Sequence, residues 1–128
     1  RSRPLRGLVE DSAAGATPAG SFDDVAAKVP GVVGSDLRTL AAEIRARVKD
    51  RPAVVALIGG TGDKPAMIVA TTESARAAGA KAGALIKAGI APIGGRGGGK
   101  DDMAQGAGND PTGIDAALHA VNAELTAL

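Results

Sequence analysis

The centre of the chain, residues 53–70, reads AVVALIGGTGDKPAMIVA. Two runs rich in β-branched and aliphatic residues, 53–58 and 66–70, flank a glycine-rich connector with the length and composition of a hairpin turn. Neither run alternates apolar and polar residues, which is typical of strands that are buried on both faces. The stretch predicts an antiparallel strand pair that needs helices packed on it.

Amphipathic patterns on both sides of this stretch supply the helices. Apolar residues recur at helical spacing over about 36–50, with Ser35 at the N-cap position and Pro52 beyond the end. A second helix is predicted over about 81–92. A last helix starts at Asp110-Pro111, and its apolar stripe consists of Ile114, Ala117, Leu118, Val121 and Leu125.

Weaker patterns complete the expected order of elements. Residues 25–29 predict a first strand and residues 103–105 a short edge strand. The resulting order, β-α-β-β-α-loop-α, predicts the α/β class, with helices packed on a small mixed or antiparallel sheet. Residues 1–21 read as a linker or the end of an upstream helix, and residues 22–128 as one domain.

Composition excludes several classes of site. The chain has no cysteine and one histidine, so it offers no disulfide framework, no zinc–thiolate site and no histidine metal cluster. No apolar run reaches membrane-spanning length and no signal peptide opens the chain, so we expect a soluble cytoplasmic protein without membrane contact. The missing initial methionine leads us to expect a processed product or an excised fragment.

Charge is unevenly distributed although the formal net charge is only +1. Residues 74–100 contain no acid, and their bases are Arg76, Lys81, Lys87, Arg96 and Lys100. Residues 101–128 contain no Lys or Arg, and their acids are Asp101, Asp102, Asp110, Asp115 and Glu124. The basic segment predicts an anion-attracting surface on a nearly neutral protein.

The basic segment ends in GGRGGGK, residues 94–100, which leaves the backbone nearly free of side chains. Glycine N–H groups can approach an anion closely, and the two cations add to the attraction. A nucleoside-triphosphate loop needs Ser or Thr after the lysine and a strand before the loop, whereas Asp101 follows and a helix precedes here. A plain flexible hinge and a grip on nucleic-acid phosphates remain as alternatives.

The near-absence of aromatic residues limits how nucleic acid can be held. Phe22 is the single aromatic residue, and it is far from the glycine segment in sequence. Proteins that bind single strands stack bases on aromatic rings, so this chain lacks that device. Any nucleic-acid contact is expected to depend on shape and phosphates, with Arg96 as the one candidate for contact with a base.

The segment GGRGGGKDDMAQG, residues 94–106, resembles the glycine-rich signature of DHH-associated domains and, more narrowly, of the C-terminal domains of bacterial alanyl-tRNA synthetases. The resemblance extends through 54–58, 68–69, Lys87 and 109–111, and it covers roughly residues 22–128. This sequence departs from the family pattern at Asp101, where proline is usual, and at Ala107, where glycine is frequent.

The resemblance implies a domain that binds the outer corner of tRNA and so supports aminoacylation and editing by its parent enzyme. It implies tRNA and the remaining synthetase domains as partners. The fragment itself shows no ATP-site motif and no His/Cys set, so we expect no catalytic residue, metal or cofactor in it, and a homodimer is a further partner to consider. The resemblance and the charge of the basic segment together predict the nucleic-acid-binding residues: Gly94, Gly95, Arg96, Gly97, Gly98, Gly99, Lys100, Gln105, Lys87 and Lys81.

Two other functions fit the same pattern. One is the nucleic-acid-binding module of a DHH-family phosphoesterase, whose metal ligands would lie in another domain. The other is a dimerisation or docking module that uses the apolar stripe of the last helix. His119 is expected at the surface of that helix, and Asp101 with Asp102 is expected to form solvated loop charges rather than a metal pair.

Overall fold

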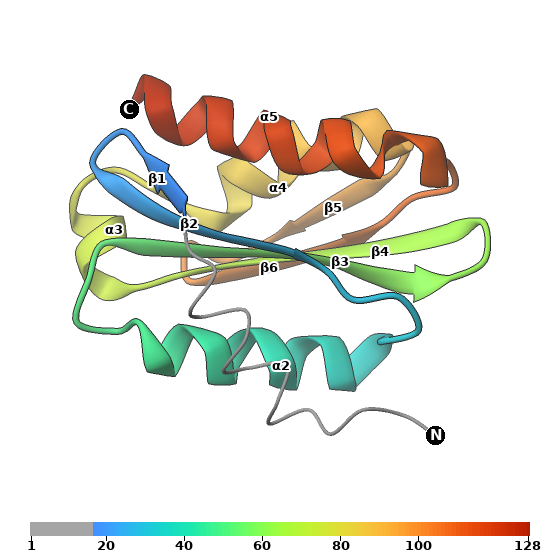
Figure 1. The fold of residues 1–128 in the computed structure, drawn as a ribbon, viewed down its shortest axis with the longest axis horizontal. Helices are drawn as coiled ribbons and strands as arrows, with labels where there is room; N and C mark the ends of the chain where they lie inside the picture. The colour runs from blue at the N-terminus through green and yellow to red at the C-terminus, as the bar shows by residue number, and fades with distance from the viewer. Residues whose placement is uncertain (1–16) are drawn as a thin grey trace.

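The fold is a computed structural model that describes residues 17–128 (Figure 1). Residues 1–16, which make up most of the predicted linker, lie outside the described residues. In chain order the elements are β1 (Thr17–Ala19), β2 (Phe22–Lys28), α2 (Gly34–Arg47), β3 (Ala53–Thr61), β4 (Lys64–Thr71), α3 (Glu73–Ala77), α4 (Ala82–Ile90), η1 (Ala91–Ile93), β5 (Arg96–Gly99), β6 (Met103–Ala107), η2 (Pro111–Gly113) and α5 (Ile114–Ala127).

The six strands form one mixed sheet in the order β1-β2-β3-β4-β6-β5. The central pair β3 and β4 is antiparallel, with Val55 opposite Ala70, so the predicted hairpin is confirmed. β2 pairs with β3 in parallel, and α2 makes the crossover connection that a parallel pair requires. The predicted α/β class is therefore confirmed, and the sheet is mixed rather than purely antiparallel.

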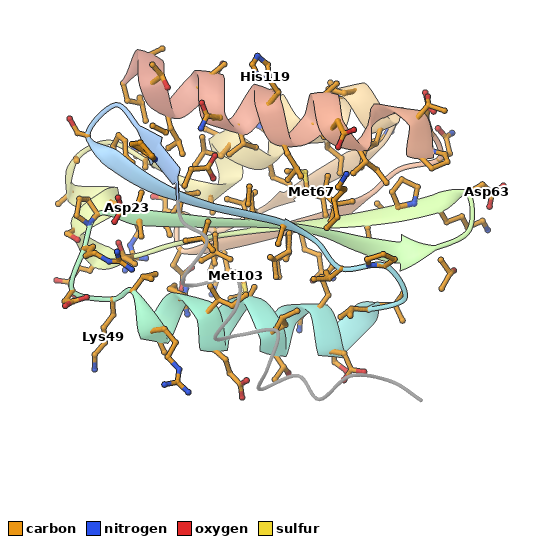
Figure 2. All side chains as sticks on the ribbon, viewed as in Figure 1. Asp23, Lys49, Asp63, Met67, Met103 and His119 are labelled. Atoms are coloured by element: carbon orange, nitrogen blue, oxygen red, sulfur yellow. The ribbon has the colours of Figure 1, made fainter. Side chains whose placement is uncertain are left out.

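Helices cover both faces of the sheet, as the unbroken apolar runs predict (Figure 1). One face packs against α2 through its buried residues Leu37, Leu40, Ala41 and Ile44. The other face packs against α4 and α5, whose buried residues include Ile86, Ile90, Val121 and Leu125. Figure 2 shows Met67 on the side of α5 and Met103 on the side of α2, so the two methionines lie on opposite faces of the sheet.

The last helix packs on the sheet through its apolar stripe and makes polar contacts with β2 from Asp115, in its first turn, and from Asn122, past its middle. Ala117, Val121 and Leu125 are fully buried. The Asn122 amide donates to Oδ2 of the buried Asp24 on β2 at 3.0 Å, and Lys28 donates to Asp115 at 2.9 Å. The apolar stripe proposed for pairing with a partner helix therefore lies in the core of this domain.

Of the two predicted helix caps, the structure confirms the one at Asp110 but not the one at Ser35. Asp110 is confirmed as a cap: its side chain accepts from the backbone N–H of Thr112 at 3.0 Å, and Pro111 opens the short helix that leads into α5. Ser35 is not the N-cap of α2, because that helix begins at Gly34, two residues before the predicted start, and Val33 holds the cap position without a side-chain bond.

Two predictions about the edges of the sheet were wrong, and one edge strand was not expected. The glycine segment was predicted as a loop, but Arg96–Gly99 is the edge strand β5. Residues 103–105 were predicted as an edge strand, but β6 lies between β4 and β5. Thr17–Ala19, inside the predicted linker, pairs with β2 as the opposite edge. Glycine is unfavourable inside strands, so a run of glycines predicts a loop. The segment is nevertheless a strand because β6 pairs with it.

Within residues 17–128 no helix combines the length and the apolar character needed to cross a membrane. The same residues contain no group of three or more His, Asp or Glu side chains arranged to hold a metal ion.

Candidate nucleic-acid interface

The glycines of β5 let this strand lie close to both β6 and α4. A Cβ on Gly97 would stand 2.9 Å from the Cα of Gly106 on β6 and 3.2 Å from Cγ1 of Ile86 on α4. A Cβ on Gly106 would in turn stand 3.0 Å from Cδ1 of Ile90. Missing side chains on both strands therefore allow α4 to pack directly on the sheet edge, so the segment is structured rather than a flexible hinge.

Most backbone N–H groups of residues 94–100 are used inside the fold. Gly94 donates to Ala91 at 3.0 Å, Gly95 to Ile90 at 3.2 Å and Lys100 to Met103 at 3.1 Å. In an antiparallel pair the residues alternate between bonding to the partner strand and facing away from it. Lys100 bonds to Met103, so Gly98 and Arg96 also bond to β6, and the N–H groups of the residues between them, Gly97 and Gly99, face the free edge. Fewer N–H groups are therefore available to bind an anion than the glycine content of the segment predicts.

The turn between β5 and β6 is fixed by its carbonyl groups. The Asp101 carbonyl accepts from the N–H of Ala82 at 2.9 Å and from the Thr71 hydroxyl at 2.6 Å. The Asp102 carbonyl accepts from the N–H of Thr71 at 3.0 Å and from the Arg45 guanidinium at 2.9 Å. These bonds tie the glycine strand to β4, α2 and α4 together, which gives the edge a defined position.

Two predicted lysines meet the glycine strand at a groove. Lys81 precedes α4 and Lys87 lies in its last turn, and both side chains are exposed. Together with Gly98 and Gly99 they line an open groove of about 520 Å³, which is completed by Gly83, Ala84 and Asp101. The structure thus brings together residues that the sequence only places within one basic segment.

The other predicted residues lie on the strand edge and on its second face. Arg96 and Lys100 are exposed, and neither forms an ion pair with another residue in the range 17–128. Arg96 stands opposite Ala107, so it shares a face with Gln105, two residues back along β6, and this is the face covered by α2. The ten predicted residues therefore surround one edge of the sheet from two faces.

Arg38 is a basic residue at this edge that no sequence pattern predicts. Nη2 of Arg38, on α2, donates to Oε1 of Gln105 at 3.0 Å. The two residues are 67 positions apart, and no motif links them. Only the packing of α2 across the sheet brings Arg38 to β6.

The acidic tail does not neutralise this basic edge. Asp110 caps the turn before α5 and Asp115 pairs with Lys28, which lies on β2 at the far side of the sheet. Asp102 approaches Arg45 at 3.9 Å, and Asp101 alone lines the lysine groove. His119 is exposed on α5 and points away from the sheet, as predicted (Figure 2). The edge therefore keeps an excess of positive charge.

Comparisons with known proteins identify relatives of the whole chain. The alanine–tRNA ligase of Cutibacterium acnes is 87% identical to the chain over 128 residues, which is the whole chain but only 14% of that protein. The C-Ala domain of Aquifex aeolicus alanyl-tRNA synthetase superimposes with a TM-score of 0.79 at 26% identity, covering 87% of this chain and 97% of that domain. The chain thus spans a small part of the synthetase but nearly all of one solved domain.

A more distant structure shares the fold. Thermus thermophilus RecJ superimposes with a TM-score of 0.66 at 17% identity, over 97% of this chain and 18% of RecJ. The DHHA1 domain family matches residues 23–127. The resemblance to the alanyl-tRNA synthetase C-terminal domain, first seen in the glycine signature, is confirmed, and the chain belongs to the DHHA1 domain family.

Proposed function

We propose that this chain, with its domain at residues 22–128, is the tRNA-binding accessory domain of an alanine–tRNA ligase. The observation that supports this most is the ordered glycine edge strand, with Arg96, Lys100, Lys81 and Lys87 exposed around it and unpaired with acids among the described residues. Parent enzyme and remaining synthetase domains are inferred from relatives of which this chain covers a small part.

In this proposal the edge strand holds RNA by its phosphates. The outward N–H groups of Gly97 and Gly99 bond phosphate oxygens, while Arg96 and Lys100 supply charge beside them. Lys81 and Lys87 contact the same backbone from the groove. Phe22 is only 2% exposed, so no aromatic ring is available for base stacking. Binding therefore follows the shape of a folded RNA, which fits the outer corner of tRNA.

The proposed biological role follows from that contact. A domain that holds the outer corner leaves the acceptor end of tRNA free for the aminoacylation and editing sites of the parent enzyme. The domain acts in the cytoplasm with that enzyme and contributes no catalytic residue. Asp101 lines the groove and reduces its positive charge, so modest affinity is expected.

Charge-deletion variants test the assignment of the edge. Substituting Arg96→Ala and Lys100→Ala together removes two phosphate contacts. Fewer counterions are then released on binding. The affinity for tRNA should fall roughly 15- to 30-fold near 0.15 M salt, and the slope of log affinity against log salt concentration should become less negative by about 1.4 to 1.8. The control is Lys28→Ala with Arg51→Ala, which removes equal charge at β2 and the loop before β3. Equal affinities for the two variants at matched salt would refute the assignment.

A homodimer is the other partner we propose to test. Sedimentation at micromolar concentration, with and without tRNA, separates a dimer from an RNA-bound monomer. A dimer that forms with rising protein concentration and whose sedimentation is unchanged by tRNA would support a docking module instead of a tRNA-binding domain.

A further inference from the structure

We infer that Arg38 is a further RNA-phosphate contact and that Gln105 is its positioning residue. This inference rests on the proposed function, because it adds a second row of contacts to the same strand edge. It also changes the role of Gln105, which the sequence predicts to contact nucleic acid directly.

Gln105 is placed to hold the Arg38 side chain at the edge. It stands opposite Gly98 in the β5–β6 register, on the face that α2 covers. Its Oε1 accepts from Nη2 of Arg38 at 3.0 Å, and both side chains are near solvent. A Cβ on Gly98 would meet no atom of residues 17–128 within 4 Å, so no part of the described chain covers the surface in front of this pair. A phosphate can therefore approach the guanidinium from the strand edge.

Among residues 17–128 the side-chain partner of Arg38 is the neutral amide of Gln105, which does not offset its positive charge. The helix positions three and four residues away hold Gly34, Ser35, Ala41 and Ala42, so no acid lies beside it on α2. The guanidinium uses one of its donors on Gln105, which leaves the others for a ligand. Two other arginines differ: Arg45 is bonded to Asp102, and Arg51 pairs with Asp23 at 3.2 Å. Within the described part of the chain, Arg38 is thus ordered without being paired to an acid.

The position of Arg38 gives the edge a second row of cations. Arg96 lies two residues from Gly98 on the same face, about 7 Å along the strand. Arg38 and Arg96 can therefore serve different phosphates of one backbone. Lys81 and Lys87 approach the strand from the opposite face, through the groove beside α4. An RNA backbone lying along β5 meets cations from both faces.

Gln105 suits the positioning role for a chemical reason. A free arginine side chain loses considerable rotamer freedom when it binds, and a pre-formed bond reduces that loss. A carboxylate at this position would hold Arg38 equally well but would cancel its charge. A neutral amide orders the guanidinium and leaves its attraction for phosphate intact.

Three variants of the 128-residue chain test this inference: Arg38→Ala, Gln105→Ala and the pair combined. Filter-binding titrations with tRNA over a range of salt concentrations give affinity and salt slope. Loss of one phosphate contact predicts that Arg38→Ala binds roughly 4- to 5-fold more weakly near 0.15 M salt, with a slope less negative by about 0.7 to 0.9. Gln105→Ala is expected to lose less, and to lose nothing further once Arg38 is gone. Lys28→Ala is the charge-matched control, and thermal unfolding checks that each variant folds.

Two results would overturn the inference. If Arg38→Ala binds no worse than Lys28→Ala, Arg38 is not a contact. If Gln105→Ala costs the same with and without Arg38, Gln105 touches RNA itself and does not act through Arg38. The variant with both Arg96→Ala and Lys100→Ala separates this inference from the proposed function. If neither it nor Arg38→Ala weakens tRNA binding, the proposed function fails. If it weakens binding and Arg38→Ala does not, only the role of Arg38 fails.

Discussion

Substituting Gly97→Ala tests whether the glycine segment is a packed strand. The added Cβ would lie 2.9 Å from the Cα of Gly106, 3.0 Å from the carbonyl oxygen of Gln105 and 3.2 Å from Cγ1 of Ile86. Carbon atoms prefer separations of about 3.5–4.0 Å, so β5 must move away from β6 and α4. Such overpacking costs about 1–3 kcal/mol of the free energy of unfolding.

The neighbouring glycine is the control for this substitution. A Cβ on Gly98 meets nothing within 4 Å in the part of the chain that the structure describes, and Gly98 has no positive φ. Gly98→Ala should therefore leave stability unchanged or raise it by about 0.4–1 kcal/mol, because alanine restricts the unfolded chain. In urea unfolding, a slope of roughly 2 kcal/mol per molar converts a 2 kcal/mol loss for Gly97→Ala into a midpoint lower by about 1 M. Equal midpoints for the two variants would refute the packed strand and favour a flexible hinge.

Three further predictions concern the rest of the fold. Burial raises the pKa of Asp24 above its ordinary value of 3.8, against the smaller opposing effect of the Asn122 bond, so the folded chain binds this proton more tightly than the unfolded chain. The free energy of unfolding should then fall as pH rises from 3.8 through the folded-state pKa, and Asp24→Asn should remove that part of the pH dependence in urea titrations. Leu125→Ala should lower the free energy of unfolding by about 2–5 kcal/mol, because Leu125 is fully buried, whereas Leu128→Ala at a 59% exposed position should change it by less than about 0.5 kcal/mol; comparable losses would contradict the packing of α5. Lys28→Ala should cost at most about 1 kcal/mol, since its ion pair with Asp115 is exposed, and a larger loss in thermal unfolding would show that the pair anchors α5.

The central layer of the fold is predictable from the sequence because its signals are local. The two apolar runs around 53–70 and the helical stripes before and after them depend only on neighbouring residues. The cap formed by Asp110 and Pro111 is equally local, and the structure confirms it. By contrast, the parallel pairing of β2 with β3 depends on how α2 crosses the sheet, which no short window of sequence contains.

The edges of the sheet are not predictable in the same way. β5 is nearly all glycine, and its strand conformation depends on pairing with β6 and on the approach of Ile86 from α4. The partnership of Arg38 with Gln105 joins an outer helix to an inner strand across 67 residues. The sequence therefore predicts which residues carry the charge, and the tertiary fold decides which face of the strand each one occupies.

RNA recognition by the glycine edge strand is tested most directly by the affinity of the 128-residue chain for intact tRNA, compared with its affinity for an unstructured RNA of equal length. A phosphate-lined contact with three to five phosphates predicts tighter binding of the folded tRNA, with a log–log salt slope of about −2 to −4. Equal affinity for the two RNAs, or binding that does not respond to salt, would contradict a grip on the backbone of a folded RNA by the glycine edge strand.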